Sequence, residues 1–215
     1  MSTGAAVTLV GTLSGVGARA GTYDARESVV LRASAVLFVT VLTALAAQIS
    51  VPLPFTPVPF TLQPMIVLLG GAALGARLGA TSQALYLLLG IAGLPVFAAS
   101  PLLPPGAARL LGPTAGFLVS YPLAAFVAGW LAERRFDRQY LTSLAAMTAG
   151  LAVIFAAGLA WLAFGPTALG LPAAAATLTP FLVADIVKLC LAAGVLPVVW
   201  RIVGPRAGHP GHPGR

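Results

Sequence analysis

Two charged residues, Asp185 and Lys188, lie within residues 178–200, a stretch that is otherwise uncharged and long enough to cross a lipid bilayer. Lys188 is the only lysine of the chain. A charge near the middle of a membrane helix costs about 2.5–3.5 kcal/mol on insertion scales, so it usually faces a partner or a polar cavity. Because residues three apart on a helix lie on the same face, the two side chains can touch. The pair is therefore either a neutralised structural contact or the polar floor of a binding site.

The composition is that of a polytopic membrane protein. Hydrophobic residues make up 59% and charged residues 8% of the chain, and the mean hydropathy is +0.97. Soluble domains contain about 25% charged residues, so no separate soluble domain is expected. The net charge of +7 does not indicate a nucleic-acid partner, because the arginines lie scattered at the ends of apolar segments. The single cysteine, Cys190, excludes an internal disulfide and a cysteine-based zinc site.

Six apolar segments predict an all-α integral membrane protein with six transmembrane helices. One helical crossing of a membrane needs about 20 residues. The six segments cover residues 31–49, 61–76, 78–97, 113–132, 141–164 and 177–200. The second segment spans only about 24 Å as a helix, so either it ends below the membrane surface or the loop before it dips into the membrane. We expect one membrane domain over residues 29–203, with flexible segments before it (1–28) and after it (204–215).

The basic residues predict that both termini lie in the cytoplasm. With that orientation, every arginine and lysine except Arg109 and Lys188 falls on the inner side, as the excess of positive charge in cytoplasmic loops requires. Arg109 is then a lone cation in the outer loop between the third and fourth segments. It is either an unpaired surface arginine or an anchor for an anionic ligand that enters from outside.

Patterns that carry common enzyme chemistry are missing from the sequence, so we expect no enzyme activity. The single lysine is followed by Leu189, which excludes a Walker A loop, and neither HExxH nor Gly-x-Ser-x-Gly occurs. No histidine lies in an apolar segment, and Asp185 has no second intramembrane acid beside it. A single carboxylate can still gain and lose a proton, so a proton-coupled carrier stays possible as an interpretation. Lys188 would oppose this proton exchange by keeping Asp185 ionised.

The first outer loop, residues 50–63, is rich in proline and also carries Phe55 and Phe60. Proline fixes φ and lacks an N–H group, so such a loop is stiff and non-helical. It suits a semi-rigid lid over a cavity, and the alternative is an ordinary outer turn. Gln63 and Pro64 are typical of the start of the following helix, because proline is tolerated in a first turn.

Further polar and aromatic residues fall on the later segments. Gln83 and Tyr86 lie three residues apart, and for Gln83 a hydrogen bond between helices explains the residue at least as well as ligand contact. Phe97 and Tyr121 lie near the outer boundary, where they either anchor a helix at the membrane surface or wall a pocket. Thr114 stands where an N-cap of the fourth helix is expected.

Several motifs, in order over residues 31–200, resemble the BioY family. The most specific is the loop at residues 49–63, ISVPLPFTPVPFTLQ. The others are residues 75–79, Gln83-x-x-Tyr86-Leu87, residues 93–97 (GLPVF), 111–114 (LGPT) and 122–126 (PLAAF), and Asp185-x-x-Lys188.

BioY proteins are the biotin-binding S components of energy-coupling-factor (ECF) transporters. The resemblance implies six helices surrounded by membrane lipid, a multi-pass protein of the bacterial cytoplasmic membrane, and high-affinity biotin capture at an outward-facing site. It also implies that two partner ATPase subunits hydrolyse ATP and act through a membrane T component. This chain would then need no cofactor of its own, which fits the missing Walker A loop.

The resemblance further implies roles for individual residues. Asp185 would accept a hydrogen bond from the ureido group of biotin, Lys188 would donate one to the ureido carbonyl, and Arg109 would pair with the valerate carboxylate. In the family, the loop that follows the position of Phe97 is commonly Gly-rich, but in this chain it is not. A polar contact with the ligand that is expected from this loop is therefore either lost or supplied by Ser100. The expected substrate-binding residues are Asp185, Lys188, Arg109, Phe97, Phe55, Gln63, Tyr86, Ser100 and Tyr121.

Two other functions stay open beside the S component. One is a solitary proton-coupled secondary carrier for biotin or a similar small molecule, with Asp185 as its proton site. The other is an assembly protein in which the Asp185–Lys188 pair only joins helices. Biotin binding would exclude the assembly protein, and transport without ATPase partners would identify the solitary carrier.

Overall fold

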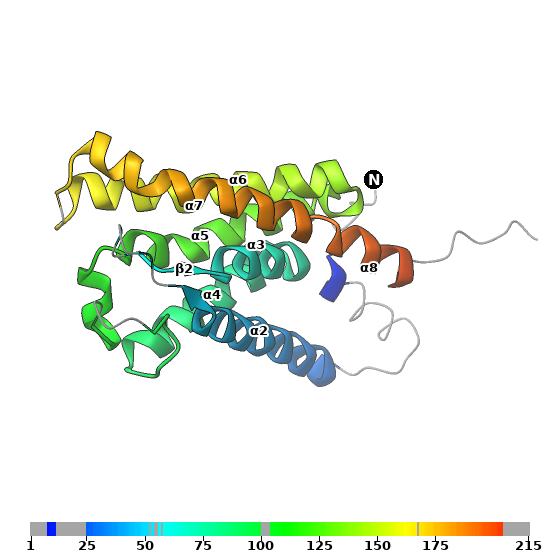
Figure 1. The fold of residues 1–215 in the computed structure, drawn as a ribbon. Coiled ribbons are helices and arrows are strands. Elements are labelled where there is room, and N and C mark those ends of the chain that lie inside the picture. The colour runs from blue at the N-terminus through cyan, green and yellow to red at the C-terminus, as the bar shows by residue number, and fades with distance from the viewer. Residues whose placement is uncertain are drawn as a thin grey trace, which may run out of the picture.

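The computed structural model describes residues 8–11, 25–51, 53, 56, 58–99, 104–166 and 168–203. Phe55, Ser100, most of segment 1–28 and the tail 204–215 lie outside the described residues. The described part is mainly helical, as the sequence predicts, and contains one small β-ladder (Figure 1).

The bundle consists of helices that follow one another along the chain. They are α2 (Ala25–Gln48), α3 (Gln63–Leu74), α4 (Ala76–Ile91), α5 (Ala115–Ala132), α6 (Tyr140–Phe164), α7 (Leu171–Ala192) and α8 (Val195–Val203). Short 3-10 helices, η1 (Gly106–Leu111) and η2 (Phe136–Arg138), lie in the loops on either side of α5. Strands β1 (Ser50–Val51) and β2 (Phe60–Thr61) pair antiparallel, with Ser50 opposite Thr61 and Val51 opposite Phe60.

The described residues contain four stretches of helix long and apolar enough to cross a membrane: Val29–Gln48, Ala115–Ala132, Tyr140–Phe164 and Leu171–Val203. Helices α3 and α4 are shorter, with 12 and 16 residues. The segment predicted over 177–200 lies within the apolar stretch Leu171–Val203, and a turn at residues 193–194 divides that stretch into α7 and α8. Gly194 lies in that turn, and glycine is a poor helix former.

Helix α5 is the central element of the bundle. It packs against α3, α4 and α6, while α7 packs against α6, and α2 packs against α3 and α4. Glycine permits the close approach of α3 and α5, since a Cβ atom on Gly71 of α3 would collide with the backbone of Ala125 in α5. Small residues serve this purpose in membrane proteins, where helices associate through close packing. Large side chains fill the core around this crossing: Leu68, Tyr86, Met147 and Ile154.

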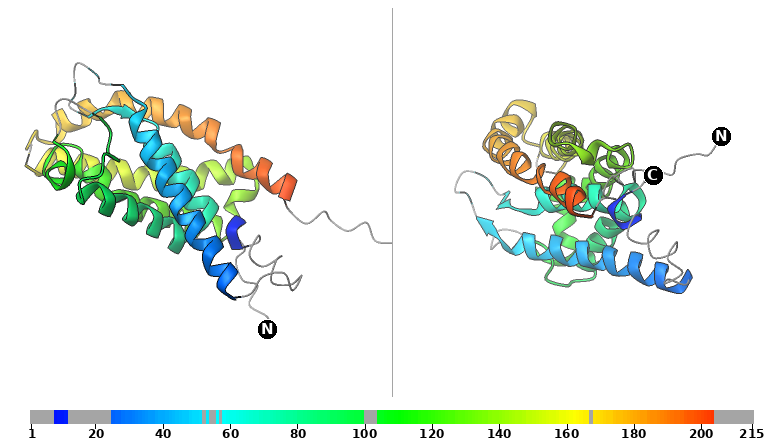
Figure 2. Two further views of the ribbon diagram at one scale, coloured as in Figure 1. Left: turned by 90° about the horizontal axis from the view of Figure 1, so that it is seen from below. Right: turned by 90° about the vertical axis from the view of Figure 1, so that its right-hand side faces the viewer.

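The two ends of the bundle differ (Figure 1, Figure 2). One end holds the β-ladder, η1 and the turn between α6 and α7, and the opposite end holds α8 and the starts of α2 and α6. Helix α3 starts inside the bundle, because Gln63 is buried and the carbonyl of Thr61 accepts a hydrogen bond from Lys188 in α7. The second predicted segment is therefore short because the chain before it enters the bundle.

Residues before the predicted membrane domain also take part in the fold. Helix α2 begins at Ala25, ahead of the expected boundary at residue 29. Leu9 lies against a cluster of Ala72, Ala132, Leu196 and Trp200. Residues 8–11 therefore contact the end of the bundle that holds α8.

Candidate binding site

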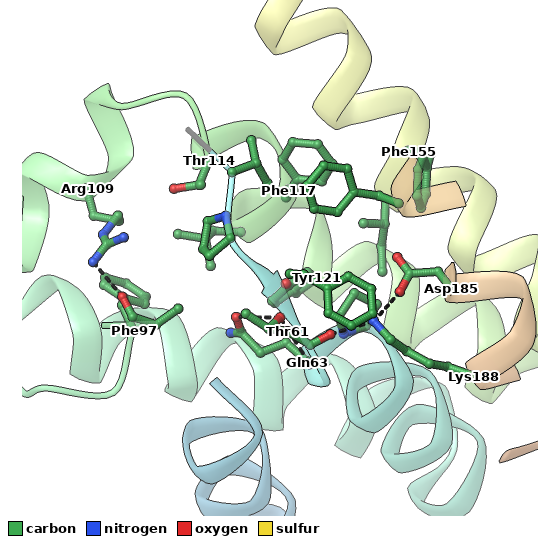
Figure 3. A pocket seen from close by; sticks show the side chains of 18 residues that line it. Thr61, Gln63, Phe97, Arg109, Thr114, Phe117, Tyr121, Phe155, Asp185 and Lys188 are labelled. Carbon is green, nitrogen blue, oxygen red and sulfur yellow. Dashed lines mark hydrogen bonds and ion pairs between the residues drawn. The ribbon is translucent and has the colours of Figure 1, made fainter. Parts of the chain in front are cut away.

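A pocket lies at the end of the bundle that holds the β-ladder (Figure 3). Its walls come from β2, the start of α3, the loops around η1, and helices α5, α6 and α7, so segments distant in sequence meet there. The lining is mostly apolar and includes a few polar and charged side chains. The lining residues are Val58, Pro59, Phe60, Thr61, Gln63, Pro64, Phe97, Ala98, Arg109, Thr114, Phe117, Leu118, Tyr121, Ile154, Phe155, Phe181, Asp185 and Lys188.

Asp185 and Lys188 form one side of the pocket. The Nζ atom of Lys188 lies 2.6 Å from Oδ1 of Asp185, 2.6 Å from the carbonyl oxygen of Thr61 and 3.5 Å from the ring centroid of Phe60. Two of the three N–H donors of the ammonium group are therefore used in hydrogen bonds, and the ring of Phe60 lies beside it. Oδ2 of Asp185 has no hydrogen-bond partner among the described residues. The pair thus presents one open, negatively charged acceptor, on a side chain that is only 5% exposed.

Arg109 lies on the opposite side of the pocket from this pair (Figure 3). It is 5% exposed, and its Nη2 donates to the carbonyl of Ala98 over 2.8 Å. Its Nε and the hydroxyl of Thr114 are buried without hydrogen-bond partners in the described part of the chain. Burial lowers the pKa of the Arg109 guanidinium, but arginine keeps its proton in proteins. An unpaired buried polar group costs about 1–3 kcal/mol, so a polar or anionic ligand group would relieve this side of the pocket.

Aromatic and aliphatic side chains line the space between the two polar sides. The rings of Phe60 and Phe181 have centroids 6.4 Å apart, and those of Phe117 and Phe155 meet edge to face at 6.5 Å. Ile154 of α6 is almost fully buried on the same wall. Such a surface suits the apolar middle of a ligand whose ends are held by polar groups.

A chain of hydrogen bonds supports the pocket from the side of α3 and α4. Nε2 of Gln63 donates to the hydroxyl of Tyr86 over 2.6 Å, and that hydroxyl donates to the carbonyl of Val96 over 3.2 Å. The hydroxyl of Thr61 donates to Oε1 of Gln63 over 3.3 Å. Because Lys188 bonds to the carbonyl of Thr61, the chain joins α7, β2, α3, α4 and the loop that follows α4.

The ring of Phe97 packs against α4 at a position occupied by glycine, Gly90. A Cβ atom on Gly90 would fall within the ring of Phe97. The ring lies edge-on to Tyr86, with centroids 5.6 Å apart and planes at 78°. Glycine at position 90 therefore lets Phe97 pack against α4 and close that side of the pocket.

Most of the residues expected from the sequence meet at this pocket. Those that line it are Asp185, Lys188, Arg109, Phe97, Gln63 and Tyr121. Tyr86 supports the lining from behind, while Phe55 and Ser100 lie outside the described residues. Because Arg109 is buried, the interpretation as an exposed surface arginine is wrong. Gln83 lies elsewhere and donates to the hydroxyl of Thr43 on α2 over 3.2 Å, in line with a hydrogen bond between helices.

Sequence reasoning missed several lining residues. Phe117 and Phe181 each lie four positions before an expected residue on the same helix, Tyr121 and Asp185, so helical spacing alone could have found them. Thr61 contributes through its backbone carbonyl, which no side-chain pattern signals. Thr114 occupies the N-cap position of α5 as expected, but its side chain makes no capping hydrogen bond and lies at the pocket wall.

The arrangement suits an elongated ligand with a hydrogen-bonding head, an apolar middle and an anionic tail. Apolar helices long enough to cross a membrane surround that pocket. Fold and pocket together define the class of the protein, a helical protein with several helices long and apolar enough to cross a membrane and with an internal pocket.

Comparison with known proteins identifies the family. The model of the BioY family matches residues 20–205, so the chain belongs to this family. A protein of Pyrococcus horikoshii described as a probable biotin transporter BioY is 43% identical over 157 residues, which cover 73% of this chain and 87% of that protein. The biotin transporter BioY of Thermotoga maritima is 42% identical over 154 residues, covering 72% of this chain and 86% of that protein.

A solved structure shares the fold. It is the crystal structure of the S-component for biotin from an ECF-type ABC transporter, with a TM-score of 0.75. The alignment covers 83% of this chain and 95% of that chain at 23% sequence identity. At this level of identity the likeness concerns the fold alone.

Proposed function

We propose that this protein captures biotin as the substrate-binding S component of an ECF-type transporter. The observation that carries the proposal is the polarity of the pocket, which places an open carboxylate oxygen of Asp185 on one side and the buried guanidinium of Arg109 on the other. Membership of the BioY family and two relatives named as biotin transporters support it.

Biotin matches this pocket group by group. Its ureido head has two N–H donors and a carbonyl, its thiophane ring is apolar, and its valerate tail ends in a carboxylate. Oδ2 of Asp185 accepts a ureido N–H, the aromatic wall covers the thiophane ring, and Arg109 pairs with the carboxylate. Hydrogen bonds to ionised groups are about twice as strong as those between neutral groups, which favours tight binding in a dry site.

Lys188 has to exchange a partner if it is to bind the ureido carbonyl directly. Its donors already face Asp185, Thr61 and Phe60, so one of the last two contacts must open. The weaker cation–π contact with Phe60 is the one we expect to yield, because an acceptor oxygen offers the stronger interaction. Lys188 then keeps Asp185 oriented while it holds the head of biotin.

The same proposal includes the placement in the membrane. We expect a single domain over residues 29–203 that crosses a bacterial cytoplasmic membrane six times, with both termini inside and the β-ladder end outside. The short α3 and α4 each count as one crossing, and the proline-rich loop covers the pocket. Arginine-rich segments at the α8 end support this orientation.

The proposal assigns ATP hydrolysis to two partner ATPase subunits, coupled through a T component, and no catalytic step to this chain. A solitary proton-coupled carrier is less well supported. The contact of 2.6 Å between Lys188 and Asp185 favours the ionised carboxylate, whereas a carrier needs that carboxylate to gain and lose a proton.

Titration of the purified protein with biotin and two analogues tests the ligand assignment. Isothermal titration calorimetry should detect binding of biotin, weaker binding of biotin amide, which lacks the anionic tail, and no binding of lipoic acid, which lacks the ureido head. Lipoic acid that binds as tightly as biotin would refute the role of the ureido head. Uptake into liposomes that contain this protein alone, driven by a pH gradient, would favour the carrier instead.

A further inference from the structure

Three arginines gather in a hollow between α5 and α6, at the end of the bundle opposite to the pocket. The hollow is lined by Arg134, Arg135, Phe136, Arg138, Gln139 and Thr142. Figure 1 shows this loop beside α8, with the full length of α6 between it and the β-ladder end. None of these residues takes part in the biotin site.

Two of the arginines are held in place by tryptophan rings. The guanidinium carbon of Arg134 lies 3.2 Å from the ring centroid of Trp130, and that of Arg138 lies 3.3 Å from the ring centroid of Trp200. The indole N–H of Trp200 donates to the carboxylate of Asp137, which fixes this ring in turn. Stacked guanidinium groups have lost most of their rotational freedom already, so little more is lost when they bind a ligand.

The acidic residues of the loop face inward and leave the arginine charge on the outside. Oε1 of Glu133 accepts a hydrogen bond from the backbone N–H of Ala76 over 2.9 Å, at the start of α4. Asp137 is 1% exposed and lies between Trp200 and Arg138. Arg134 and Arg135 are exposed, so their charges are available to a ligand in the hollow.

Backbone features point to the same hollow. Arg135 has a φ of 71°, a left-handed conformation that costs a non-glycine residue about 1–2 kcal/mol and that often marks a functional position. Helix α6 starts beside the hollow at Tyr140, and its N-cap, Gln139, makes no side-chain capping hydrogen bond. The first N–H groups of this 25-residue helix therefore add a partial positive charge to that of the arginines.

We infer that this hollow binds the phosphodiester headgroup of an anionic phospholipid. Guanidinium groups match phosphate oxygens through paired N–H donors, and a helix N-terminus accepts the same charge. The lipid is favoured over free phosphate because exposed apolar surface adjoins the charges: the ring of Trp130, 43% exposed, lies 3.2 Å from the guanidinium carbon of Arg134, and Leu141, 74% exposed, precedes Thr142 in α6. The inference goes beyond the proposed function and shares with it only the placement of this end at the inner membrane surface.

Native mass spectrometry of the detergent-purified full chain tests this inference. Wild-type protein mixed with phosphatidylglycerol should retain one lipid in preference to phosphatidylcholine. The variant Arg134→Gln/Arg135→Gln should bind it roughly tenfold more weakly or worse, since each arginine near an anionic lipid contributes about a factor of five. Arg138 is left unchanged because it pairs with the buried Asp137.

A charge-matched control separates this hollow from a general effect of net charge. Arg77→Gln/Arg201→Gln removes two exposed arginines from the same end of the bundle and should retain phosphatidylglycerol like the wild type. Equal losses in both variants, or none in the first, would overturn the site. Displacement of the lipid by excess inorganic phosphate would instead identify a site for free anions. The assay contains no biotin, so its outcome does not depend on the proposed ligand.

Discussion

The ammonium nitrogen of Lys188 lies 2.6 Å from a carboxylate oxygen of Asp185, and the second carboxylate oxygen has no partner among the described residues. The two residues therefore meet each other before any ligand arrives. The pair is a structural contact through Oδ1 and Nζ and a candidate binding group through Oδ2. The sequence left these two interpretations as alternatives, and the geometry accommodates both at once.

Replacing both charges of the pair separates its structural role from its binding role. We expect Asp185→Leu/Lys188→Leu to fold and to unfold at a temperature near or above that of the wild type, because apolar replacement of a buried ion pair is often neutral or stabilising by about 1–4 kcal/mol. Lys188→Met alone should cost about 3–5 kcal/mol, since it leaves Asp185 buried without a partner. Thermal unfolding in detergent measures both, and a folded double variant that still binds biotin normally would remove the pair from the site.

Arg109 should recognise the carboxylate of biotin and nothing else of the ligand. In the wild type, biotin should bind about 10- to 100-fold more tightly than biotin amide, as expected for a hydrogen bond between charged groups. Arg109→Gln should bind the two ligands equally, and Arg109→Lys should restore part of the difference. Calorimetric titration of each variant with each ligand gives the comparison, and an unchanged preference in Arg109→Gln would contradict the assignment.

Tyr86 should act on affinity through the residues that it positions. Tyr86→Phe removes the hydroxyl that joins Gln63 to the carbonyl of Val96 and leaves the ring contact with Phe97 in place. We expect a loss of stability of about 1 kcal/mol, the usual net value of one hydrogen bond, and a fall in biotin affinity of a few-fold. A loss as large as that caused by Asp185→Asn would mean that Tyr86 touches the ligand itself.

Gly90 should be as sensitive to substitution as a lining residue, although it does not line the pocket. Gly90→Ala places a methyl group within the ring of Phe97 and should push this ring from its site. Overpacking of this kind costs about 1–3 kcal/mol, and biotin affinity should fall with it. Gly194→Ala is the matched control, because the nearest atoms leave room for a Cβ there. Equal affinity in the two variants would show that Phe97 is not required.

The charged residues of the site could be predicted from the sequence because a charge is conspicuous in an apolar chain. Asp185 and Lys188 interrupt a membrane segment, and Arg109 breaks the charge pattern of the loops. The α6 side of the pocket wall could not be predicted as readily, since Ile154 and Phe155 are apolar residues in an apolar helix. Which of them faces a pocket depends on how α5 and α6 pack against each other.

Fold features that depend on the backbone were harder to predict than helical content. The turn between α7 and α8 at residues 193–194 lies in sequence as apolar as the helices that it separates, so hydropathy does not signal it. The short length of α3 was visible, but the reason for it was not. The chain before α3 enters the bundle, where the carbonyl of Thr61 accepts a hydrogen bond from Lys188, a residue 127 positions away.

The affinity of Asp185→Asn for biotin tests the central claim most directly. The substitution keeps the shape of the side chain and removes its charge, so we expect biotin to bind at least tenfold more weakly by isothermal titration calorimetry, as the loss of about 1.4 kcal/mol from a charged hydrogen bond implies. Thr179→Val, an exposed change on the same helix, should bind like the wild type. If folded Asp185→Asn protein binds biotin as tightly as the wild type, Asp185 does not hold the ureido head and the proposed site is wrong.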